Sequence, residues 1–146
     1  MRLRRTGAAA FAVAFVALAA PASAFAHAAL LRTTPSASVT LNKPPKELRL
    51  TYSEAVEPRF ATVSVTDPQA SQETDGRPVR AEADPNTLVT PLKPDLPQGW
   101  YLVYWRVISA DGHPVKGAFT FALVDEAGAE RILGGPLPEA WKRFCR

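Results

Sequence analysis

The chain has 146 residues, which corresponds to a single domain. Its formal net charge of +3 equals the contribution of Arg2, Arg4 and Arg5, and the remaining basic and acidic side chains balance. This balance gives no support for a nucleic-acid partner, which requires a basic patch on the folded domain. Cys145 is the one cysteine, so an intramolecular disulfide is excluded.

Residues 1–26 are predicted to form a secretory signal peptide. The three arginines are followed by an apolar run, residues 8–20, and then by small residues up to Ala26, which is the order typical of such peptides. A membrane anchor is the alternative, but the run falls short of the roughly 20 residues that a span needs. No second run of that length follows, so we expect no membrane span in the mature protein.

Two cleavage positions satisfy the rule of small residues before the cut. Cleavage after Ala26 would release a chain that begins with His27, and cleavage after Ala24 would release Phe25. The pattern alone leaves both open, and the pair Arg4-Arg5 leaves the general and the twin-arginine export routes open. We expect the mature protein in the periplasm, or at the cell envelope or outside the cell where no periplasm exists.

The mature chain is predicted to be all-β. Fourteen prolines argue against long helices, and apolar residues alternate with polar ones in short segments that turn signals separate. The predicted strands are residues 29–33, 48–53, 61–66, 79–81, 88–90, 100–108 and 118–124. About seven such strands fit a Greek-key β-sandwich. Residues 125–146 are interrupted by Gly and Pro, and whether they pack on the domain or extend into solvent stays open.

Trp100 and Trp105 could be mistaken for a pair of aromatic ligand-binding residues. They lie five positions apart in one predicted strand and should therefore point to opposite faces. Trp105 shares its face with Val103 and Val107, so we predict that it lies in the core.

The two histidines are the candidates for metal chemistry. His27 would begin the mature chain, where its α-amine and ring Nδ1 can chelate one metal ion, and a second imidazole from His113 would give the three-nitrogen arrangement called a histidine brace. Asp111, in the turn Ser109-Ala110-Asp111-Gly112-His113, can add a carboxylate. Tetragonal nitrogen and oxygen ligation favours Cu(II). Taken singly, each feature also fits a solvated loop histidine or an ordinary Asp-Gly turn, and spacing does not show that the two histidines meet.

From His27 onward the chain resembles the CopC family of periplasmic copper-resistance proteins. The matching segments are His27-Ala28-Ala29-Leu30, Thr34-Pro35-Ser36-Ala37, PKELRLTYSEAV, LPQGWYLVYW and RVISADGHPVKGAFTF, the last being the most specific. The resemblance implies a seven-stranded Greek-key β-sandwich, cleavage before His27, and a Cu(II) site formed by His27, Asp111 and His113. It places Glu54 as an axial ligand or as a neighbour of the ligands.

The resemblance also implies a domain over residues 27–124, with a C-terminal tail, residues 125–146, of unassigned role. Some family members bind Cu(I) at a methionine-rich site, but Met1 is the one methionine here and leaves with the leader. Because soft thioethers suit Cu(I), we predict one Cu(II) per chain and no separate Cu(I) site. The expected partners are the copper ion and an inner-membrane copper transporter of the family's usual type. The expected oligomeric state is a monomer, with a dimer linked through Cys145 as the alternative under oxidation.

Three functions are compatible with these features. The first is a copper carrier or buffer for copper homeostasis and resistance, which is not an enzyme. The second is an oxidative enzyme of the polysaccharide monooxygenase type, which uses the same histidine brace. An anionic Asp111 on the metal would disfavour reduction to Cu(I) and so argues against the enzyme. The third is a metal-independent adhesion or assembly module, because β-sandwiches host many functions.

Overall fold

The computed structural model describes residues 27–133. The predicted signal peptide, residues 1–26, and Cys145 in the tail lie outside the described residues, so both predictions about them stay predictions.

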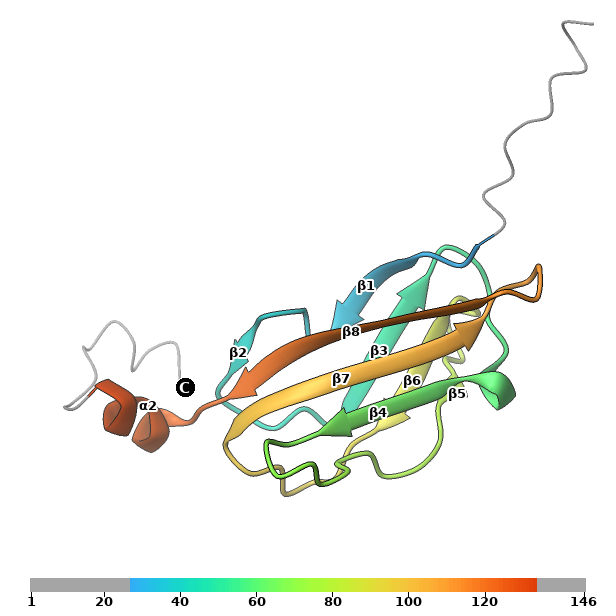
Figure 1. The fold of residues 1–146 in the computed structure, drawn as a ribbon. Helices are drawn as coiled ribbons and strands as arrows, with labels where there is room; N and C mark the ends of the chain where they lie inside the picture. The colour runs from blue at the N-terminus through green and yellow to red at the C-terminus, as the bar shows by residue number, and fades with distance from the viewer. Residues whose placement is uncertain (1–26, 134–146) are drawn as a thin grey trace, which may run out of the picture.

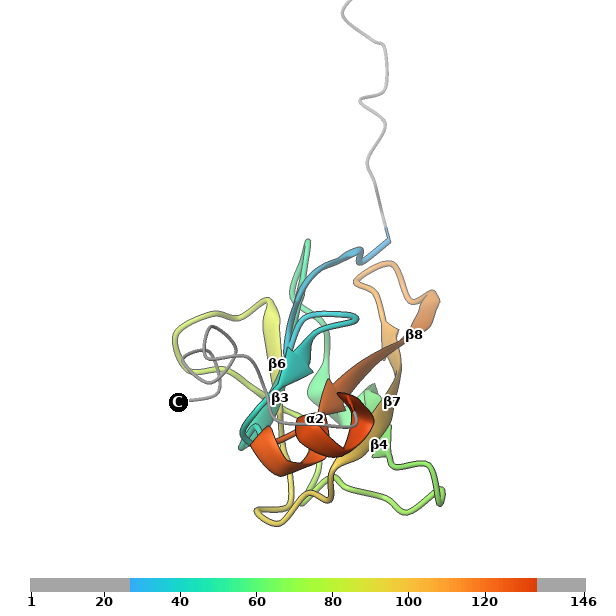
Figure 2. The ribbon, with the colours of Figure 1, turned by 90° about the vertical axis from the view of Figure 1, so that its left-hand side faces the viewer.

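The described chain forms a two-layer β-sandwich (Figure 2). Each layer is a sheet of four strands. The first sheet has the order β1 (Leu30–Thr34), β3 (Glu47–Tyr52), β6 (Thr87–Pro91) and β5 (Val79–Arg80), and the second has the order β2 (Thr40–Leu41), β8 (Pro114–Leu123), β7 (Gly99–Ile108) and β4 (Thr62–Thr66). The chain crosses between the sheets at every connection except those from β5 to β6 and from β7 to β8. The predicted all-β sandwich is thereby confirmed.

The core lies between the two sheets and follows the alternation in the sequence. On β7, Tyr101, Val103 and Val107 are fully buried, and the residues at alternate positions, Leu102, Tyr104 and Arg106, face outward. On β3, Leu48 and Leu50 meet them from the opposite sheet. One inward-facing stripe on each strand therefore forms the common core, as expected when successive side chains point to opposite faces.

The two tryptophans of β7 lie on opposite faces, as predicted. Trp105 is 6% exposed and packs edge-on against the Tyr52 ring, with ring centroids 5.6 Å apart. Trp100 is 61% exposed on the outer face of the sheet. Trp105 is therefore a core residue, and the two do not form a ligand-binding pair.

Each of the seven predicted strands is present, with some differences in extent. β8 begins at Pro114 rather than near Ala118, because its whole length pairs antiparallel with β7, from Gly99↔Leu123 to Ile108↔Pro114. The two-residue strand β2 was not predicted, and it pairs parallel with the end of β8. A strand of two residues is too short to show an alternation of apolar and polar side chains.

Two short helices complete the described chain, η1 (Pro58–Phe60) and α2 (Glu126–Leu133). Asp125 caps α2, because its Oδ1 accepts a hydrogen bond from the Gly128 backbone N–H at 2.7 Å. The first part of the tail is thus a helix at the end of the sandwich. None of the described helices has the length and hydropathy that a membrane crossing requires.

The two ends of the sandwich differ (Figure 1). The start of β1 and the loop between β7 and β8 lie at one end, and α2 lies at the other. The segments that carry the two histidines, far apart in the sequence, therefore meet at the same end of the fold.

Candidate metal centre

His27 is held by a short arm, Ala28 and Ala29, which precedes β1. The Ala28 side chain is 1% exposed and belongs to the core. Ala29 exchanges two hydrogen bonds with Ser53: its N–H donates to Ser53 Oγ at 2.9 Å, and its carbonyl accepts from the Ser53 N–H at 2.8 Å. The arm is therefore fixed to Ser53 through both the N–H and the carbonyl of Ala29 before the pairing of β1 with β3 begins at Leu30↔Tyr52.

Asp111 and His113 are held by the tight loop between β7 and β8. The Ser109 N–H donates to the His113 carbonyl at 3.0 Å, and the Gly112 N–H donates to the Ser109 carbonyl at 2.9 Å. Gly112 has φ +85°, a left-handed conformation that a side chain would strain. The Asp-Gly pair thus serves as a turn and also presents two functional side chains.

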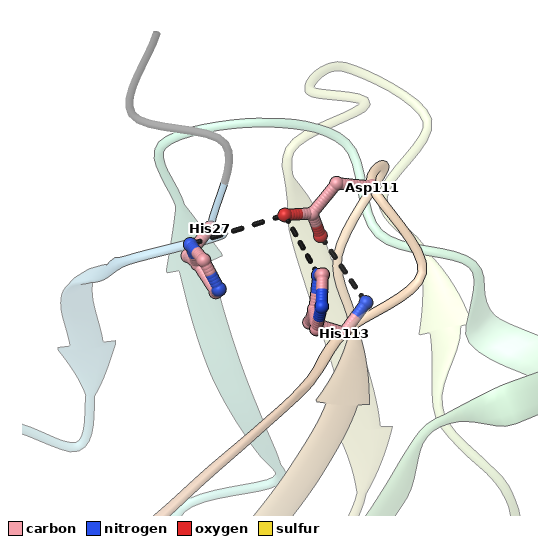
Figure 3. Close-up of side chains that lie close together, drawn as sticks. All are labelled: His27, Asp111 and His113. Atoms are coloured by element: carbon pink, nitrogen blue, oxygen red, sulfur yellow. Dashed lines mark hydrogen bonds and ion pairs between the residues drawn. The ribbon is translucent and has the colours of Figure 1, made fainter. Parts of the chain in front are cut away.

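The two segments bring His27, Asp111 and His113 together (Figure 3). One potential ligand atom from each residue lies within 4.8 Å of the others. Asp111 Oδ2 is 3.0 Å from His113 Nδ1 and 3.9 Å from His27 Nδ1. The carboxylate therefore approaches both imidazoles, which is the convergence that spacing in the sequence did not show.

The charge of Asp111 is fixed by its loop. The Ser109 hydroxyl donates to Asp111 Oδ1, and the His113 N–H donates to the same oxygen at 3.2 Å. These bonds, that from Ser109 first, lower the pKa of Asp111 to about 2. Asp111 is therefore an anionic oxygen donor at every pH at which the imidazoles can bind a metal.

The site is open to solvent. The side chains of His27 and His113 are 65% and 64% exposed, and that of Asp111 is 22% exposed. Two imidazole nitrogens and one carboxylate suit a borderline divalent cation such as Cu(II). A site on the surface, at the end of a rigid sandwich, can take up and release an ion without any opening of the fold.

Glu54 occupies a different position from the three clustered residues. Its Oε1 accepts a hydrogen bond from the Ala110 N–H at 3.0 Å, so it contacts the backbone of the β7–β8 loop. Among the described residues, the group that could hold a metal comprises His27, Asp111 and His113 without Glu54. A direct role of Glu54 on the metal stays a prediction.

Sequence reasoning missed two residues of this region, Ser53 and Ser109. Ser109 precedes Asp111 by two positions, a spacing at which a hydroxyl can bond to a carboxylate in a turn, so the sequence held a local signal. Ser53 carries no such signal, because its contact with Ala29 joins two segments that lie 24 positions apart in the sequence.

Comparison with known proteins places the chain in a family. The model of the CopC domain matches residues 30–124. Protein YobA of Escherichia coli K12 is 36% identical over 101 residues, which cover 69% of this chain and 82% of that protein. Copper resistance protein C of Xanthomonas campestris pv. juglandis is 36% identical over 110 residues, which cover 71% of this chain and 85% of that protein.

Solved structures agree with this relationship. The crystal structure of CopC from Methylosinus trichosporium OB3b superimposes with a TM-score of 0.61 at 30% sequence identity. The alignment covers 66% of this chain and 93% of that one. The resemblance inferred from the sequence motifs is confirmed.

Proposed function

Because the chain belongs to the CopC family, we propose that it is an exported protein that binds one Cu(II) ion and serves copper homeostasis and resistance. His27, Asp111 and His113 are the proposed ligands. The observation that carries this proposal is their convergence, with a potential ligand atom from each residue within 4.8 Å of the others.

The α-amine of His27 would complete the site once the leader is removed. Cleavage after Ala26 frees an amine next to the His27 ring, and the amine and Nδ1 can then close one chelate ring on the metal. Metal ligands must be deprotonated to bind, and a free α-amine has a pKa of about 8 in unperturbed peptides. Copper therefore displaces this proton with little cost near neutral pH, whereas an amide nitrogen in an uncleaved chain is a far poorer ligand.

The anionic donor favours Cu(II) over Cu(I). A negative oxygen on the metal stabilises the higher charge, and the low pKa of Asp111 keeps that oxygen ionised. The mature chain offers no methionine sulfur, the ligand type that suits Cu(I). We propose a carrier or buffer rather than a redox enzyme, acting in the periplasm or at the cell envelope and delivering copper to an inner-membrane transporter.

A competitive Cu(II) titration tests the proposal. The protein exported and processed by a bacterial host is compared with the same domain carrying one extra residue before His27. We expect the processed form to bind one equivalent of Cu(II) far more tightly than the extended form. Equal and weak binding by both would refute the histidine brace.

Two controls separate the competing functions. His113→Ala should abolish tight binding while leaving the fold intact, because the His113 side chain is largely exposed. Oxidation of a polysaccharide by the copper-loaded protein with a reductant would instead favour the enzyme. Copper binding no tighter than that of an ordinary surface histidine would favour the adhesion module.

A further inference from the structure

We infer that Ser53 and Glu54, adjacent residues just after β3, act together as a clamp that sets the distance between the two halves of the copper site. This inference rests on the proposed function. It assigns Ser53 a role that no sequence motif suggested, and it assigns Glu54 a positioning role in place of a ligand role. The clamp is defined as these two residues.

The site has two halves, His27 on one segment and Asp111 with His113 on the other. Each half lies beyond the regular strand pairing of its own sheet. His27 precedes the first pair of β1 with β3, Leu30↔Tyr52. Asp111 and His113 lie in the loop that follows the last pair of β7 with β8, Ile108↔Pro114. Backbone pairing within the sheets therefore does not by itself fix the distance from His27 to the other two ligands.

The clamp contacts both halves. The Ser53 Oγ accepts from the Ala29 N–H at 2.9 Å, two residues after His27. The Glu54 Oε1 accepts from the Ala110 N–H at 3.0 Å, one residue before Asp111. Because Ser53 and Glu54 are covalently adjacent, these two bonds join the histidine arm to the β7–β8 loop through a bridge of two residues.

Such a bridge raises affinity through preorganisation. A metal that finds its ligands already at the right separation does not pay the entropy of ordering them, and binding groups need support from the residues around them to hold their geometry. The exposure of both histidine side chains, 65% and 64%, makes this support of the backbone on either side more important.

The first test removes the bond to the arm. Ser53→Ala deletes the acceptor for Ala29, while the bond from the Ser53 N–H to the Ala29 carbonyl stays available. One hydrogen bond of about 1 kcal/mol corresponds to about a three- to tenfold loss of Cu(II) affinity. We expect that loss, faster copper transfer to a chelator, and broader Cu(II) electron paramagnetic resonance lines. Ser53→Thr retains a hydroxyl and should restore all three.

The second test separates positioning from ligation. Glu54→Gln keeps a carbonyl oxygen that can accept from the Ala110 N–H, whereas Glu54→Ala removes it. We expect the Gln variant to stay within about threefold of wild type, and the Ala variant to lose about three- to tenfold. A Gln variant as impaired as the Ala variant would show that the charge or direct ligation matters, and would overturn the positioning role.

Matched controls address the fold. Ser64→Ala removes a surface hydroxyl that donates to Gln72 Oε1 at 2.8 Å, and Glu47→Gln removes a carboxylate paired with Arg49 at 2.7 Å. Neither should alter copper affinity or the resonance spectrum. Wild-type affinity and spectrum in Ser53→Ala would refute the clamp, whereas absence of tight binding in the processed wild-type protein would refute the proposed function itself.

Discussion

The imidazole rings of His27 and His113 face each other with centroids 5.1 Å apart and ring planes inclined by 35°. Asp111 approaches the Nδ1 atoms of both rings with one oxygen. Two imidazoles and a carboxylate thus share one small volume at the end of a rigid sandwich. The properties of that volume, and of the core that supports it, lead to four predictions.

The first prediction concerns the charge of Asp111. Asp111→Asn keeps the size of the side chain but removes its negative charge. Charge-assisted contacts contribute about 1.5–3 kcal/mol, so we expect roughly a ten- to hundredfold loss of Cu(II) affinity. The Cu(II)/Cu(I) potential should rise, because the oxidised ion loses an anionic neighbour. Competitive titration and voltammetry measure the two effects, and an unchanged potential would contradict the proposed ligation.

The second prediction concerns the Ser109 hydroxyl, the main cause of the low pKa of Asp111. In Ser109→Ala, that pKa should rise from about 2 toward its ordinary value of 3.8. Folding lowers the pKa of this carboxyl, so its ionised form stabilises the folded state. This stabilisation is complete at pH values above the ordinary pKa of 3.8 and is lost as the pH falls toward 2. In the variant this carboxyl should titrate at nearly the same pH in the folded and unfolded states, so the variant should be less stable than wild type at neutral pH, and its stability should fall less steeply than that of wild type as the pH drops from 3.8 toward 2.

Carbon-13 NMR of the Asp111 carboxyl in the copper-free protein measures this pKa directly. Asp125, which caps α2 through Gly128, serves as an internal reference because it lies at the opposite end of the sandwich. The same Asp111 midpoint in both proteins would show that the hydroxyl does not control the carboxyl.

The third prediction concerns Gly117 and the indole of Trp105. A Cβ built on Gly117 would lie 2.7 Å from Trp105 Cζ2, so the indole occupies the space that any other side chain would need. Gly117→Ala should destabilise the protein by about 1–3 kcal/mol through overpacking. Urea denaturation measures the loss, and the neighbouring exposed residue offers a control, Ala118→Ser, with little expected change.

Relief of the clash should be visible in a double variant. Trp105→Phe replaces the indole with a smaller ring, so adding Gly117→Ala to it should cost less than adding Gly117→Ala to wild type. Equal costs in the two backgrounds would mean that the strain arises elsewhere.

The fourth prediction concerns stability at alkaline pH. Tyr101 is fully buried, and burial, with smaller contributions from the charges of Glu73 and Asp67, raises its pKa to about 12. A raised pKa means that the neutral phenol is favoured by folding. Its contribution is complete below the ordinary value of 10.0 and is lost as the pH rises from there through about 12.

Tyr101→Phe tests this predicted loss of stability at alkaline pH. The variant lacks the hydrogen bond from the phenol to the Pro97 carbonyl and should lose about 1 kcal/mol near neutral pH. Its stability should fall less steeply than that of wild type above pH 10. Thermal denaturation at a series of pH values measures both, and parallel curves would exclude Tyr101 as the titrating group.

Much of the fold could be predicted from local pattern. Alternation on β3 and β7 identified the strands and assigned Trp105 to the core, because side-chain direction in a strand depends on residue parity alone. The same reasoning could not find β2, whose two residues exist as a strand through pairing with Ala122 and Leu123. The early start of β8 was missed because it depends on the length of its partner β7.

For the candidate site, too, one part could be predicted from the sequence and another part depended on the tertiary structure. Residue types, the position of His27 after a leader-like segment, and the resemblance to the CopC family were enough to identify His27, Asp111 and His113 as candidate ligands. Local chemistry determined these choices, since a metal site requires donor side chains that the sequence names directly. What the tertiary structure decided was their proximity, the contact of Glu54 with the Ala110 backbone, and the tether from Ser53 to the histidine arm. These depend on how separate strands dock across the sandwich, and no local pattern encodes the distance between segments that meet only when the core is packed.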